Sequence, residues 1–105
     1  MSENIKTFPT LAQLRAQRDE IIEIAQRHGA FNVRIFGSVA RGESTPESDV
    51  DVMVSMREGV NMFDLVGLWL DLQELLRCDV SLITDDDHPR RERFMQQARK
   101  DAVPL

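Results

Sequence analysis

The segment from Asp49 to Ser55 (DVDVMVS) constrains the fold more than any other part of the chain. Its valines stand at alternate positions, which predicts a β-strand with the valines on one face. Asp49 and Asp51 then share the opposite face. That face cannot lie in an apolar core, because burying two unpaired carboxylates costs too much free energy. The strand is therefore expected in a sheet with one face covered and the aspartates on an open face.

The remaining periodicities predict three helices and two further strands. Thr10 is a candidate N-cap for the first helix, and Gly29 is its candidate stop. The expected elements are a helix over residues 10–28, a strand over Asn32–Phe36, the strand Asp49–Ser55, a helix over Asn61–Arg77, a strand over Asp79–Ile83 and a helix over Arg90–Ala102. The order α-β-β-α-β-α predicts an α/β (α+β) fold, with a small mixed sheet and helices on one face. With 105 residues, we expect a single domain spanning 1–105.

Composition excludes several classes of protein. The net charge is −5 and the sequence has no long basic run, so direct nucleic-acid binding is not expected. The single cysteine, Cys78, allows no internal disulfide, which favours a reducing cytoplasm. The N-terminus lacks a signal-peptide pattern, and Asp71, Gln73 and Glu74 interrupt the longest apolar stretch, so a membrane location is not expected.

The chemistry of the open face points to phosphoryl or nucleotidyl transfer. Asp79 begins the third predicted strand and adds a third carboxylate to the two aspartates. Mg²⁺ prefers carboxylate and phosphate oxygens, and two such ions about 4 Å apart can share aspartates. Gly37 and Ser38 follow the first strand, where backbone N–H groups and a hydroxyl can meet phosphate oxygens. Arg41 can reach a phosphate or pair with an acid (Glu43 or Asp49).

Three other interpretations compete with this site. A calcium-binding loop would need an oxygen ligand where Met53 stands and a glycine where Val54 stands. Aspartates can also blunt an edge strand, and Asp79 alone can be a solvated turn residue.

The string RIFGSVARGESTPESDVDVMV (residues 34–54) resembles the signature of the DNA polymerase beta-like nucleotidyltransferases, and of their minimal branch (MNT proteins) in particular. The later CDVSLI and the C-terminal RRERFMQQARKDAVPL are also similar to that branch. The resemblance implies that Asp49 and Asp51 hold two Mg²⁺ ions and that Asp79 binds the catalytic ion near the acceptor hydroxyl. It further implies that Gly37 and Ser38 hold the triphosphate of ATP.

Many MNT proteins are antitoxins paired with HEPN ribonuclease toxins. The resemblance therefore implies an adenylyltransferase that moves AMP from ATP to a tyrosine of a HEPN partner, in a hetero-oligomer. Two alternatives stay open: an antitoxin that acts by binding alone, and a nucleotidyltransferase that modifies a small molecule. The helix over Asn61–Arg77 carries an apolar stripe that is either buried or a protein interface; the stripe comprises Met62, Leu65, Val66, Trp69, Leu72 and Leu76.

Overall fold

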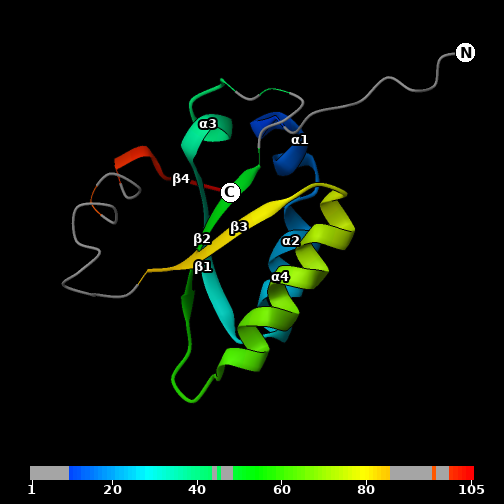
Figure 1. The fold of residues 1–105 in the computed structure, drawn as a ribbon, viewed down its shortest axis with the longest axis vertical. Helices are drawn as coiled ribbons and strands as arrows, with labels where there is room; N and C mark the ends of the chain where they lie inside the picture. Colours follow the sequence, from blue (N-terminus) through cyan, green and yellow to red (C-terminus); the bar gives the residue numbers. More distant parts are fainter. Residues whose placement is uncertain (1–9, 44, 46–48, 86–95, 97–99) are drawn as a thin grey trace, which may run out of the picture.

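The computed structural model describes residues 10–43, 45, 49–85, 96 and 100–105. Its elements are α1 (Leu11–Ala16), α2 (Arg18–Arg27), β1 (Ala30–Phe36), α3 (Gly37–Ala40), β2 (Val50–Met56), α4 (Met62–Leu76), β3 (Val80–Thr84) and β4 (Val103–Pro104). The sheet order is β3-β2-β1-β4 (Figure 1). β2 pairs parallel with β3, and β1 pairs antiparallel with β2 and with β4. The mixed sheet predicted from the sequence is confirmed.

The predicted first helix is two helices. Thr10 caps α1 through a reciprocal pair of bonds with Gln13, as its position before the apolar run indicated. At Gln17 the backbone leaves helical geometry (φ −103°, ψ 17°), and α2 begins at the next residue. Both helices nevertheless turn their apolar residues inward, since Leu14, Ile21 and Ala25 are all buried.

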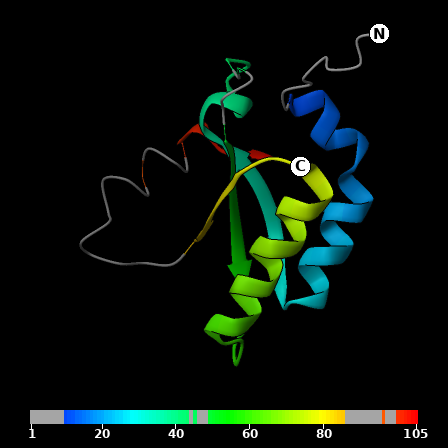
Figure 2. The ribbon, with the colours of Figure 1, turned by 45° about the vertical axis from the view of Figure 1, so that its right-hand side comes forward.

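Helices α2 and α4 lie side by side on one face of the sheet (Figure 2). Their leucines and isoleucines meet the valines of β2 in the main core. A hydrogen bond joins the two helices. It connects His28 Nε2, at the end of α2, with Asp71 Oδ2 of α4 at 2.7 Å. None of the helices in the described ranges has the length and apolarity needed to cross a lipid bilayer.

The second face of the sheet is covered around Met53, which corrects the expectation of a wholly uncovered face. Met53 shares the Asp51 face of β2 and is 0% exposed. It packs with Phe36 in a second cluster, against which Ile83 and Ala102 pack. The C-terminal segment thus covers the Met53 end of this face, because the apolar side chain there needs burial.

The predicted helix over Arg90–Ala102 is described only in part. Most of that range lies outside the described residues, although Gln96, Lys100 and Asp101 are helical. Beyond Asp101 the chain forms β4, a strand that the sequence did not predict. Its two residues pair with Arg34 and Ile35 of β1.

Candidate active site

Three candidate segments meet at one end of the sheet. β1 ends at Phe36, which pairs with Asp51 of β2. β2 and β3 begin beside each other, since Val50 pairs with Val80. The turn at Gly37 and the carboxylates at Asp49 and Asp79 therefore cluster at the same end, next to α3 (Figure 1).

Gly37 lies directly against the Asp51 carboxylate. Its φ of +72° is a left-handed conformation that other residues adopt only with strain. A Cβ added at Gly37 would collide with Asp51 Oδ2. Glycine is thus required twice over, by the backbone conformation and by the close approach of the carboxylate. Ser38, the next residue, is half-buried in the first turn of α3.

Asp51 is held in an electrostatically unfavourable position. Partial burial raises the pKa of its carboxyl, and the neighbouring Asp49 carboxylate raises it further. The charge of Arg41 and a hydrogen bond with Ser81 act in the opposite direction. Ser81 pairs with Asp51 across the parallel strands. Sequence reasoning gave Ser81 no role; matching the triplets 49–51 and 79–81 in parallel register would have found it.

Asp49 and Asp79 are both exposed and each immediately precedes a strand. The Val50 N–H donates to the Asp79 backbone carbonyl at 3.0 Å, which holds the two strand starts together. Burial raises the pKa of the nearby Cys78 thiol, and the charges of Asp79 and then Asp49 raise it further. The charges of both carboxylates therefore raise the pKa of the same thiol, as expected for two aspartates at neighbouring strand starts.

The carboxylates are neighbours without forming a closed ligand shell. Within the described part of the chain, no three His, Cys, Asp or Glu side chains gather closely enough to hold a metal ion. The donor chemistry still suits a hard divalent cation, because the oxygens are carboxylate oxygens and Asp49 already repels Asp51. A cation between them would relieve that repulsion.

Arg41 makes two ion pairs beside the site. Its Nε donates to Glu43 Oε1 at 2.9 Å and its Nη1 donates to Asp101 Oδ2 at 2.8 Å. The hydrogen bonds with Glu43 and then Asp101 raise the pKa of Arg41. The Glu43 pairing was one of the sequence alternatives, whereas Asp101 was not foreseen because it lies 60 positions away. A phosphate contact of Arg41 stays a prediction.

Asp85 directly follows β3. Asp85 pairs with Arg34 Nη1 at 3.0 Å, and its N–H donates to the Val54 carbonyl. It therefore extends the β2–β3 ladder. Asp86 and Asp87 lie outside the described residues.

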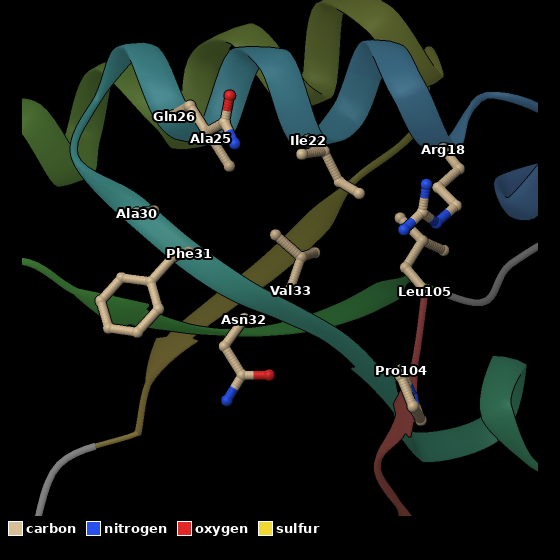
Figure 3. A pocket seen from close by; sticks show the side chains of 10 residues that line it. All are labelled: Arg18, Ile22, Ala25, Gln26, Ala30, Phe31, Asn32, Val33, Pro104 and Leu105. Carbon is tan, nitrogen blue, oxygen red and sulfur yellow. The ribbon is translucent and has the colours of Figure 1, made fainter.

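A cavity of about 280 Å³ lies at the other end of β1 (Figure 3). Ala30 to Val33 form one wall, with Arg18 and Leu105 opposite. The cavity exists because β4 pairs only with the later residues Arg34 and Ile35. It contains none of the predicted site residues.

Comparisons with known proteins identify the family of the chain. The family model described as Polymerase beta, Nucleotidyltransferase matches residues 19–105. A protein of Methanocaldococcus jannaschii, provisionally named a protein adenylyltransferase, is 38% identical over 81 residues, which cover 75% of this chain and 87% of the relative. The protein adenylyltransferase MntA of Thermococcus cleftensis is 34% identical over 61 residues, covering 58% of this chain and 62% of the relative.

Solved structures have the same fold. One provisionally named a minimal nucleotidyltransferase has a TM-score of 0.78 at 39% identity, covering 92% of this chain and 97% of that one. A toxin–antitoxin crystal structure with AMP-PNP has a TM-score of 0.68 at 20% identity, covering 82% of this chain and 69% of that one, a similarity of fold alone. With the family model matching most of its length, the chain belongs to the polymerase beta nucleotidyltransferase family.

Proposed function

We propose that this chain is an antitoxin that transfers AMP from ATP to a tyrosine of a partner HEPN ribonuclease toxin in the cytoplasm. The contact between the Gly37 backbone and the Asp51 carboxylate carries the proposal. It brings the turn expected to hold phosphates against the carboxylates expected to hold a cation. The names of the adenylyltransferase relatives support transfer of AMP to a protein.

Each site residue has a distinct part in this proposal. The Gly37 and Ser38 backbone N–H groups and the Ser38 hydroxyl bind the triphosphate of ATP, with Arg41 at its edge. The carboxylates of Asp49, Asp51 and Asp79 would hold Mg²⁺, which when bound would neutralise charge on the phosphates.

The reaction itself is an in-line substitution at the α-phosphate. The tyrosine hydroxyl loses its proton and forms a new P–O bond, while the bond to the bridging oxygen breaks and pyrophosphate leaves. Asp79 directly precedes the edge strand β3, and in this proposal it binds the catalytic ion near the acceptor hydroxyl. The chain contains no tyrosine, so a labelled tyrosine must come from another protein.

Transfer of labelled AMP tests the proposal. The chain is incubated with Mg²⁺, ATP labelled at the α-phosphate and the protein encoded by the adjacent gene. We expect label on a tyrosine of the partner, and no label with the Asp49→Asn/Asp51→Asn double variant. Asp19→Asn is the matched control, because the Asp19 side chain is 99% exposed on α2. Neutralisation of the partner that persists in the double variant, without label, would instead support an antitoxin that acts by binding.

A further inference from the structure

Helix α4 has an apolar face that the rest of the described chain leaves exposed. Its core side is formed by Leu68 and Leu72, which are buried against the sheet and α2. Of the predicted apolar stripe, only Leu72 is buried. At 3.6 residues per turn, the exposed apolar residues fall within a sector of roughly 120°. They are Met62 (70% exposed), Phe63 (86%), Val66 (44%), Trp69 (37%) and Leu70 (52%).

This α4 face continues into a groove beside β3. The groove has a volume of about 210 Å³ and is lined by Leu65, Val66 and Trp69 from α4 and by Leu82 from β3. An apolar surface that combines an exposed helix face with a groove is typical of protein–protein contacts.

The groove is tied directly to the acceptor end of the candidate site. Trp69 Nε1 donates to the Val80 carbonyl at 2.7 Å, and the Val80 N–H donates to Gln73 Oε1 at 3.2 Å. Val80 is the residue after Asp79. Trp69 therefore connects the middle of α4 to the residue after Asp79, whereas Met62 and Phe63 lie at the start of α4, the end away from Asp79 (Figure 1).

The charge of the chain favours one kind of occupant for the α4 face. Glu74 borders the exposed apolar sector, whereas Asp64 caps the start of α4 and Asp71 faces His28 of α2. Two copies of this chain would each bring a net charge of −5 to the contact. A different protein with lysines or arginines around an apolar patch is electrostatically complementary.

We propose that the α4 face and its groove dock the protein that receives AMP, with basic residues of that protein surrounding its apolar contact. Docking there presents the acceptor hydroxyl at the Asp79 end of the sheet. A protein acceptor must be held in position during in-line attack, and the minimal chain has this surface beside the site for that purpose. This inference rests on the proposed function for the nature of the acceptor.

Binding of the protein encoded by the adjacent gene, measured by calorimetry, tests the proposal. Phe63→Ser/Leu70→Ser is the test variant, since both side chains are largely exposed and their loss should leave the melting temperature unchanged. We expect its Kd to rise about tenfold or more over wild type. Phe31→Ser is the matched control, because Phe31 is also exposed (43%) but lies on β1, and its Kd should equal that of wild type.

Several results would overturn the docking surface. Equal Kd values for wild type and the α4 variant would do so, as would no binding by wild type. Wild-type dimers that the α4 variant converts to monomers, with partner binding intact, would assign the face to self-association. A different result would contradict the proposed function while leaving the docking surface intact. In that case wild type binds the partner through α4, but no labelled AMP is transferred to the partner. Asp49→Asn/Asp51→Asn should bind normally while transferring no AMP.

Discussion

Replacement of Gly37 by alanine should damage both stability and catalysis, for two separable reasons. Its φ is +72°, and a Cβ there collides with Asp51 Oδ2. Gly42 provides a matched control, because its φ is +74° and a Cβ added there would have no atom of the described chain within 4 Å. Only the first reason applies to Gly42→Ala.

The magnitudes follow from these contacts. Left-handed backbone costs a non-glycine residue about 1–2 kcal/mol, and this term is common to both variants. Gly37→Ala must also displace the Asp51 carboxylate, which disrupts its hydrogen bond with Ser81 at a cost of about 1 kcal/mol more. We therefore expect losses of about 1–2 kcal/mol for Gly42→Ala and about 2–3 kcal/mol for Gly37→Ala.

Urea unfolding of both variants, with and without Asp51→Ala, measures the two terms separately. In the Asp51→Ala background the collision is absent, so the two glycine variants should lose similar stability. AMP transfer should fall with Gly37→Ala and persist with Gly42→Ala. Equal losses for the two glycine variants in the presence of Asp51 would refute the reasoning.

Three further predictions concern neighbouring contacts. The pKa of Asp51 is raised in the folded chain, so its ionisation lowers stability as pH rises above the unfolded value of 3.8. Asp51→Asn should therefore raise the melting temperature at pH 7 in chelator-treated buffer, and the gain should vanish below pH 3.8. Trp69→Phe removes the bond to Val80 and should lower the free energy of unfolding by about 1 kcal/mol in urea; no loss would show that the bond is unimportant. Arg41→Gln should raise KM for ATP with little change in the melting temperature, because the Arg41 side chain is 45% exposed and its pair with Glu43 lies in solvent; a lower melting temperature with unchanged KM would leave it a structural role only.

Local patterns were enough to predict most of the secondary structure. Alternating valines predicted β2, and the small residues at Gly37 and Ser38 predicted the turn into α3. A strand is indicated by apolar side chains at alternate positions, and a tight turn by residues that tolerate unusual backbone conformations. Both signals come from residues that are adjacent in the sequence. The carboxylate pair Asp49 and Asp51 was found in the same way.

Contacts between distant residues could not be read from the chain alone. Burial of Met53 depends on the C-terminal segment, and the partner of Arg41 is Asp101, 60 residues away. Whether the apolar stripe of α4 is buried or exposed also stayed open, because a helix apolar on most sides offers several faces for burial. The sequence by itself determined the strands β1, β2 and β3 and the acidic pair. Only the tertiary structure decided which apolar faces are buried and which stay exposed, because burial depends on which surfaces the folded chain brings together.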